Sequence, residues 1–247
     1  TTYTQPRRAR LTVEQQAGNG GVKQSGTVEI TQNPGSAKQY AATLYQFGRK
    51  DAFPGVPDGN IYNGDGVKST TAFKKVSVNS GVYIRATIQN PGTLYVTTNS
   101  NAYPLYDQTY CNTWSADNTK LSNFSYDAVV KTIYDPCPAG FHMPTSKAFT
   151  GFTKNGQNRG PINAPADGWN QGYTFYCLPF PSGGTIFFPA VGCRRGDNGS
   201  LGYLGYDCLY RSAQPYEYYG NYALGFSQGL VDWKRSADRT SACPVRP

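Results

Sequence analysis

Tyr134-Asp-Pro-Cys-Pro-Ala-Gly-Phe-His-Met-Pro-Thr145 is the most distinctive stretch of this 247-residue chain. Its prolines and its glycine break it into successive turns. Directly after it, Phe149 and Phe152 lie three residues apart, a spacing that places both on one face of a helix. The sequence therefore predicts a turn over residues 134–145 and a short helix over residues 144–152.

A second helix is predicted on the N-terminal side of this turn. Hydrophobic residues recur there with the period of one helical face, and they are Ala37, Tyr40, Ala41, Leu44 and Phe47. Ser36 suits the N-cap and Gly48 the end, so the predicted helix covers residues 36–48. The apolar residues between Val76 and Ile88 fit either a strand or a helix.

The first 35 residues predict β-structure instead. Residues 9–18 and 26–35 each alternate apolar and polar side chains, and Gly18-Asn-Gly-Gly21 lies between them. This pattern predicts a β-hairpin, or the end of an Ig-like module followed by the first strand of a new domain. A linker that pairs with nothing is the remaining alternative. We divide the chain accordingly into a segment over 1–35 and a domain over 36–247.

Short strands separated by turns are predicted in the C-terminal third of the chain. They cover residues 173–178, 185–191, 209–212, 222–226 and 242–246. Two helices early in the domain and short antiparallel strands late in it indicate the α+β fold class.

The composition is typical of a loop-rich globular protein. The chain holds 28 Gly, 17 Pro and 20 Tyr, whereas charged residues make up only 15%. Such a composition excludes a helical bundle, and 14% aromatic residues supply too much apolar surface for a disordered chain. The net charge of +8 is scattered in small clusters, so we expect no nucleic-acid partner. No apolar run approaches the roughly 20 residues of a membrane span.

The sequence predicts neither an enzyme nor a metal site. His142 is the single histidine, so a Ser–His or Cys–His pair has one candidate base, and that base lies within the Pro-rich turn. The six cysteines form no Cys-x-x-Cys pair. Their even number and wide spacing favour disulfides in an oxidising compartment, with buried free thiols as the alternative. We expect no catalytic residue, no metal and no cofactor.

Tyrosine, tryptophan and arginine are concentrated between residues 203 and 235. Tyr and Trp offer rigid contact area with a polar group, and Arg adds directional hydrogen bonds, as in antibody combining sites. The candidate ligand-binding residues are Tyr203, Tyr206, Asp207, Tyr210, Arg211, Tyr216, Glu217, Tyr218, Tyr219, Trp233, Lys234 and Arg235. We expect residues 216–219 on a loop and Tyr222, Leu224 and Phe226 pointing inward. The alternative is that half of the tyrosines belong to the core of a terminal sheet.

Several segments resemble the FISUMP-type domain, the major paralogous domain of Fibrobacter and Bacteroidales surface lipoproteins. The turn over residues 134–145 is similar to the hallmark of that family. Leu44-Tyr-Gln-Phe-Gly-Arg-Lys-Asp-Ala-Phe-Pro54 is similar to its Tyr-Gln-Trp-Gly-Arg-Lys-Asp-Pro-Phe-Pro segment. Residues 88–94 and 184–201 also match, so the resemblance covers roughly residues 38–247.

The resemblance implies a C-type-lectin-like fold with two helices, a small antiparallel sheet and a ligand-binding face near the C-terminus. It also implies export to the bacterial cell surface, as a lipoprotein or as the tip subunit of a fimbrium, with other fimbrial subunits as further partners. Relatives carry cysteines at places that match Cys111 and Cys137, and both border turns, which implies a disulfide between them.

Departures from the family pattern carry a second implication. Arg211 stands where relatives have Trp, and Asn221 is the one asparagine after residue 200, whereas sixteen precede it. Lectin-fold proteins diversified by retroelements have a C-terminal block in which template Asn codons have mutated. We therefore expect a hypervariable binding face, with ordinary divergence of a surface loop as the alternative.

These features together favour an extracellular adhesin that binds a surface protein or a glycan of a host or of another bacterium. A phage tail receptor-binding protein of the same fold is the alternative interpretation.

Overall fold

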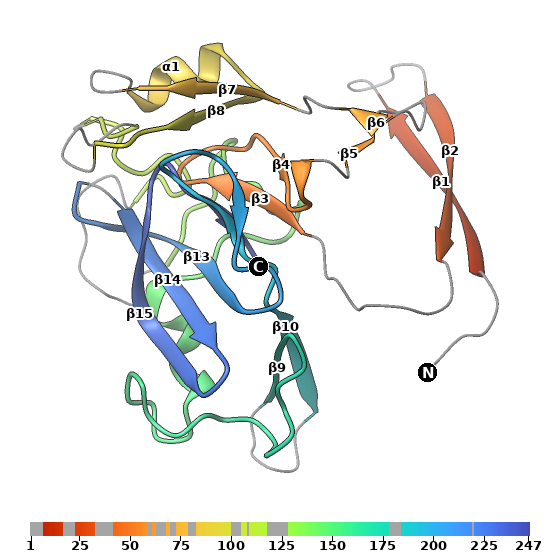
Figure 1. Cartoon of the computed structure of the whole chain (residues 1–247). Helices are drawn as coiled ribbons and strands as arrows, with labels where there is room; N and C mark the ends of the chain where they lie inside the picture. Colours follow the sequence, from red (N-terminus) through yellow and green to blue (C-terminus); the bar gives the residue numbers. More distant parts are fainter. Residues whose placement is uncertain are drawn as a thin grey trace. The chain divides into compact units, whose positions relative to one another are not determined.

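The computed structural model contains two compact units, Thr1–Lys38 and Gln39–Pro247 (Figure 1). The residues that the structure describes are 7–16, 23–32, 42–58, 61–62, 68–69, 73–78, 83–99, 105–107, 109–117, 128–177, 184–218 and 220–247. Each unit is described by itself below.

The first unit is an antiparallel pair of strands. β1 (Arg7–Gln16) and β2 (Lys23–Gln32) pair along their whole length, from Arg7 opposite Gln32 to Gln16 opposite Lys23. The two alternating segments of the sequence thus pair with each other, rather than forming a linker that pairs with nothing.

The second unit is built from small sheets. Its five-stranded sheet has the order β12 (Leu201–Gly202), β11 (Cys193–Arg194), β16 (Ala242–Pro244), β3 (Thr43–Gln46) and β4 (Phe53–Pro54). A three-stranded antiparallel sheet consists of β13 (Asp207–Tyr216), β14 (Gly220–Ser227) and β15 (Leu230–Asp238). The other strands form pairs: β9 (Gly172–Tyr176) with β10 (Thr185–Pro189), β5 (Ile61–Tyr62) with β6 (Lys68–Ser69), and β7 (Lys74–Ser77) in parallel with β8 (Thr93–Val96). Among the described residues, α1 (Ile84–Gln89) is an α-helix and η3 (Ser146–Phe152) is a 3-10 helix.

The predicted α+β, C-type-lectin-like fold with two helices is wrong. The structure is mostly β, with 39% strand against 8% helix. Residues 36–41 of the first predicted helix lie outside the described residues, but Thr43–Gln46 is strand β3, which pairs with β4 and with the C-terminal strand β16. A partner at the far end of the chain decides this conformation, and a local hydrophobic period cannot report such a partner.

Other predicted segments are found where the patterns place them. η3 forms within residues 144–152, and the ambiguous stretch over 76–88 divides between the end of β7 and most of α1. The five predicted strands coincide with β9, β10, β13, β14 and β16, whereas the sequence did not predict β11, β12 and β15 in the same part of the chain.

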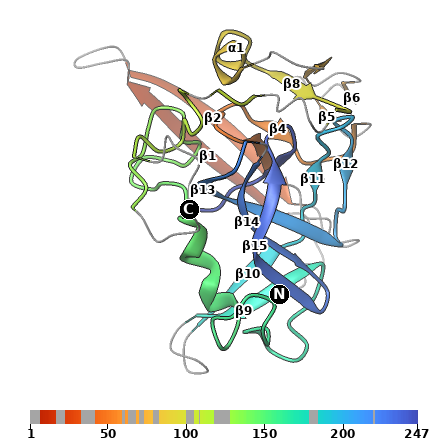
Figure 2. The same cartoon turned by 90° about the vertical axis from the view of Figure 1, so that its left-hand side faces the viewer.

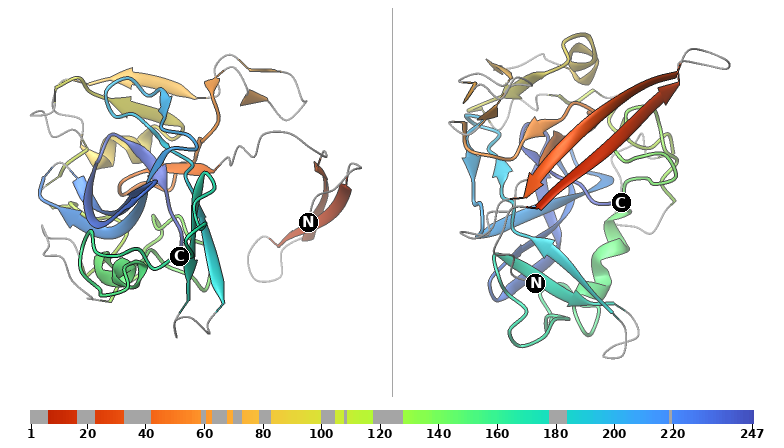
Figure 3. Two further views of the ribbon diagram at one scale, coloured as in Figure 1. Left: turned by 60° about the horizontal axis from the view of Figure 1, so that its bottom comes forward. Right: turned by 90° about the vertical axis from the view of Figure 1, so that its right-hand side faces the viewer.

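The main core lies between the three-stranded sheet, the β9–β10 pair and η3, and Figures 2 and 3 show η3 (green) beside β9–β10 (teal). Aromatic rings fill it edge to face: the ring centroids of Phe188 and Tyr210 are 4.9 Å apart, and those of Phe152 and Phe188 are 5.0 Å apart. Tyr210 also stacks on Phe226 at 5.9 Å. Full burial of such a side chain contributes about 1.5–3 kcal/mol, so this cluster holds the C-terminal strands in place.

Candidate functional site

A cavity of about 670 Å³ opens on the second unit, and we call it the C-terminal cavity. Its walls come from the loop after β8, from β11 and its following turn, from the turn before β13, and from the end of β15 with the turn into β16. The lining residues are Thr97, Thr98, Gly192, Cys193, Arg195, Gly196, Asp197, Tyr203, Asp207, Cys208, Leu209, Arg235, Asp238, Arg239, Thr240 and Ser241. Its volume lies within the range of small-molecule sites, about 300–1,000 Å³.

Two glycines allow the walls of the cavity to approach one another. Gly192 has φ +66°, and a Cβ there would stand 2.1 Å from the carbonyl oxygen of Gly202. A Cβ on Gly196 would stand 2.4 Å from Oγ1 of Thr240. The carbonyl of Gly196 also accepts a hydrogen bond from the backbone N–H of Thr97 at 2.7 Å. A larger residue at Gly192 or Gly196 would force these strands and turns apart.

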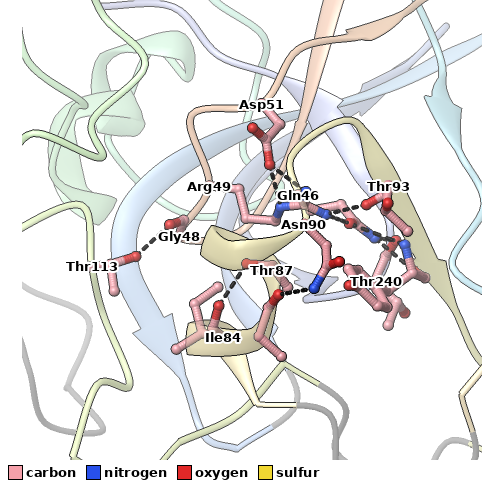
Figure 4. A network of polar contacts seen from close by, with 12 residues as sticks. Gln46, Gly48, Arg49, Asp51, Ile84, Thr87, Asn90, Thr93, Thr113 and Thr240 are labelled. Carbon is pink, nitrogen blue, oxygen red and sulfur yellow. Dashed lines mark hydrogen bonds and ion pairs between the residues drawn. The ribbon is translucent and has the colours of Figure 1, made fainter. Parts of the chain in front are cut away.

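A buried polar network holds the Thr240 wall in position (Figure 4). Nε2 of Gln46, on β3, donates to the carbonyl oxygens of Tyr95 and Thr240, each at 2.6 Å. Its Oε1 accepts from Nη1 of Arg49 at 2.6 Å, and that nitrogen also donates to the carbonyl of Thr93 at 2.6 Å. Burial lowers the pKa of Arg49, and its ion pair with Asp51 opposes that shift. β3, β8 and the turn before β16 are therefore joined beside the cavity.

The lining carries three arginines and three aspartates, so its formal charges balance. The guanidinium of Arg195 donates two hydrogen bonds to the carboxylate of Asp197, from Nη2 to Oδ2 at 2.7 Å and from Nε to Oδ1 at 3.1 Å. These hydrogen bonds lower the pKa of Asp197. Asp207 differs, because burial raises its pKa while Arg235, with Nη1 at 3.8 Å from Oδ2, opposes the rise. The cavity thus presents donors and acceptors side by side.

Three of the sequence-predicted ligand residues line this cavity: Tyr203, Asp207 and Arg235. Tyr203 is 50% exposed and has φ +65°, and its carbonyl accepts the backbone N–H groups of Tyr206 and Asp207, each at 2.9 Å. Tyr206 is 69% exposed on the same turn, but it does not line the cavity. The turn therefore presents two tyrosine rings to solvent, one of them at the cavity.

Tyr210, Arg211 and Trp233 lie in the interior, which corrects the expectation that they form an exposed face. The hydroxyl of Tyr210 donates to the carbonyl of Pro189 at 2.9 Å, and Nε1 of Trp233 donates to Oγ1 of Thr153 at 3.3 Å. The reason is that β13, which carries Tyr210 and Arg211, is buried along most of its length on both faces, a property that alternation cannot predict. Trp233 lies in the buried part of β15, over residues 231–233.

Residues 216–218 of the predicted loop do not line the cavity. Tyr216 ends β13 with its ring 5.0 Å from that of Tyr222, and Glu217 and the 47%-exposed Tyr218 form a turn. The carbonyl of Tyr218 accepts from Nε of Arg239 at 2.8 Å. Lys234 is exposed on β15 and does not line the cavity, and Tyr219 lies outside the described residues.

The residues that sequence reasoning missed come from other segments. Arg195 and Asp197 belong to a turn, Arg194-Arg-Gly-Asp197, whose charged residues were a weak signal for a binding turn. Thr97, Thr98 and Thr240 carry no such signal, because contacts between distant segments bring them to the cavity. Thr97 donates to the carbonyl of Gly196, and β16, which follows Thr240, pairs with β11.

The cysteine pair that the family resemblance implies stays a prediction. Cys111 and Cys137 are both buried, and both thiols are free in the structure. Burial raises the pKa of each thiol, that of Cys137 to about 12.

No family model, no curated protein and no solved structure matches the chain. Within the described parts of the chain, no group of three or more His, Cys, Asp or Glu side chains is arranged to hold a metal ion. In the same parts, no helix combines the length and the hydrophobicity needed to cross a membrane.

Proposed function

We propose that the chain is an extracellular adhesin of a bacterial surface and that it binds a glycan in the C-terminal cavity. The observation that carries the proposal is the lining itself: paired Arg and Asp side chains and threonine hydroxyls surround about 670 Å³, with an exposed tyrosine ring at the edge. Concave sites with a few convergent polar groups are the usual places for small ligands.

A glycan suits this lining for two reasons. Sugar hydroxyls both donate and accept hydrogen bonds, and the Arg195–Asp197 and Arg235–Asp207 pairs offer both functions side by side. The exposed ring of Tyr203 offers an apolar face for the C–H groups of a sugar ring. The balanced charges of the lining favour a neutral ligand over a strongly anionic one.

The proposal is tested with glycan arrays probed by the purified chain, followed by titration calorimetry on each glycan that binds. Tyr203→Ala and Arg235→Ala should each weaken binding by about 10-fold or more, since truncating a central contact costs on the order of 2 kcal/mol. Lys234→Ala is the matched control, because Lys234 is the exposed neighbour of Arg235 on β15 and does not line the cavity. It should change the affinity by less than about twofold, as near-neutral positions do.

Two results would contradict the proposal. One is binding to a glycan that the Lys234 variant loses while the two cavity variants keep it. The other is binding of a surface protein, and of no glycan, through residues outside the cavity.

A further inference from the structure

Two buried cysteines face each other across neighbouring strands beside the C-terminal cavity. β11 and β16 are antiparallel, with Arg194 opposite Ala242. One step along the same register, Cys193 falls opposite Cys243. Directly opposed residues of an antiparallel pair point to the same face with Cα atoms about 4.5–5.5 Å apart, which lies within the range that a disulfide spans.

The surroundings of the two sulfur atoms agree with this register. Cys193 and Cys243 belong to one small apolar cluster with Ala223 and Ala237. The two thiols also hydrogen-bond to each other, which raises the pKa of Cys193 and lowers that of Cys243. The positive charge of Arg211 also lowers the pKa of Cys243 and favours its thiolate.

We propose that Cys193 and Cys243 form a structural disulfide that ties the C-terminal strand to β11. The oxidant is a small disulfide such as oxidised glutathione. Cys193, which lines the cavity, loses its proton to solvent, and the resulting thiolate attacks that disulfide and releases one thiol. The Cys243 thiolate then attacks the Cys193 sulfur of the mixed disulfide and releases the second thiol. The two cysteines lose two electrons and two protons in total, and the oxidant gains them.

Cys208 is the competing thiol, and its geometry argues against it. It is buried on β13 and forms a parallel bridge with Gly192, so it is not opposite either cysteine in an antiparallel register. Its Sγ lies 3.8 Å from the carbonyl oxygen of Gly192 and donates to it. We expect Cys208 to stay a free thiol when the other two are oxidised. This inference does not depend on what the cavity binds.

The bond would have a defined place in the fold. It would close the loop from residue 193 to residue 243, which contains β12, β13, β14 and β15. Because Cys193 lines the cavity, the bond would also fix one wall of the cavity to β16, the C-terminal strand of the chain and the central strand of the sheet.

The test is a peptide map of the full chain after oxidation with oxidised glutathione and alkylation of the remaining thiols. Trypsin with chymotrypsin separates Cys193 from Cys177 by cleavage after Phe187, and cleavage after Arg195, Arg211 and Arg239 separates Cys193, Cys208 and Cys243. The expected result is one cross-linked peptide pair that holds Cys193 and Cys243, lighter by two hydrogen atoms than the two reduced peptides, with Cys208 alkylated.

Two variants add an independent measurement. The melting temperature of the parent should rise on oxidation, Cys208→Ala should keep that rise, and Cys193→Ala should lose it. A cross-link of Cys193 or Cys243 to any other cysteine would overturn the proposal. So would alkylation of both residues in the folded, glutathione-treated chain. If Cys193→Ala does not fold, the peptide map of the parent still decides.

Discussion

Replacing Arg211 should remove a large part of the protein's stability, although Arg211 lies in a segment rich in the residue types that are common in binding sites. Its side chain is 0% exposed. Its guanidinium donates to four carbonyl oxygens, those of Tyr45 at 3.2 Å, Ala237 at 3.4 Å, Asp238 at 2.6 Å and Ser241 at 2.5 Å, and also to Oδ1 of Asn221. These acceptors lie on β3, β14, the end of β15 and the turn that leads into β16. One side chain therefore joins the two larger sheets of the second unit.

The magnitude follows from the acceptors that Arg211→Ala leaves without a donor. Each buried unsatisfied acceptor costs about 1–3 kcal/mol, and relaxation or entering water recovers part of that cost. We expect the free energy of unfolding to fall by about 3–5 kcal/mol, the range for breaking a buried charged network. For a chain of this size, such a loss lowers the melting temperature by roughly 6–20 °C.

The assay is urea unfolding followed by tryptophan fluorescence, since Trp114 and Trp233 are buried. A reducing buffer keeps the proposed disulfide from contributing. Arg211→Met, which keeps much of the volume but donates no hydrogen bond, should be nearly as destabilised as Arg211→Ala. The control is Arg235→Ala, whose side chain is 41% exposed and whose carboxylate partner is 3.8 Å away, and it should lose less than about 1 kcal/mol. An Arg211→Ala loss no larger than that of the control would refute the reasoning.

Three further predictions concern other parts of the second unit. Burial raises the pKa of Asp232, but hydrogen bonds from Asn158 and Arg159 outweigh it and hold that pKa below its ordinary value. The stability that these bonds provide is therefore present at neutral pH and is lost as the pH falls below about 4. Asp232→Asn should therefore lose about 1–3 kcal/mol at pH 7, and thermal melts from pH 7 to pH 2 should show the gap to the parent closing in acid; a constant gap would contradict this. Gly192→Ala should lose about 1–3 kcal/mol more than Gly229→Ala in urea unfolding, because both have positive φ but only Gly192 would place its Cβ against the Gly202 carbonyl. Gln46→Ala should lower the melting temperature, because it leaves the carbonyls of Tyr95 and Thr240 without their donor. Glycan affinity measured well below that temperature should also fall, since Thr240 lines the cavity.

The sequence by itself determined much of the local structure of this protein. Turn residues and alternation located β9, β10, β13, β14 and β16, and the Phe149–Phe152 spacing located η3. The concentration of aromatic residues after residue 200 also pointed to the part of the chain that supplies much of the cavity wall. Short-range patterns carry this information because turn chemistry and side-chain period depend on neighbouring residues.

The tertiary structure alone decided the fold class and the direction of the site side chains. Leu44 and Phe47 have a helical spacing, yet Leu44 lies on a strand because its backbone pairs with Pro244. Arg211 is of a residue type that is common in binding sites, yet it is buried because carbonyl groups from three other segments accept its hydrogen bonds. Thr97 and Thr240 meet at one cavity through hydrogen bonds between distant segments, since Thr97 donates to Gly196 and Gln46 donates to the carbonyls of Tyr95 and Thr240. Each outcome depends on partners far away in the sequence, and no local period or composition records where those partners come to lie.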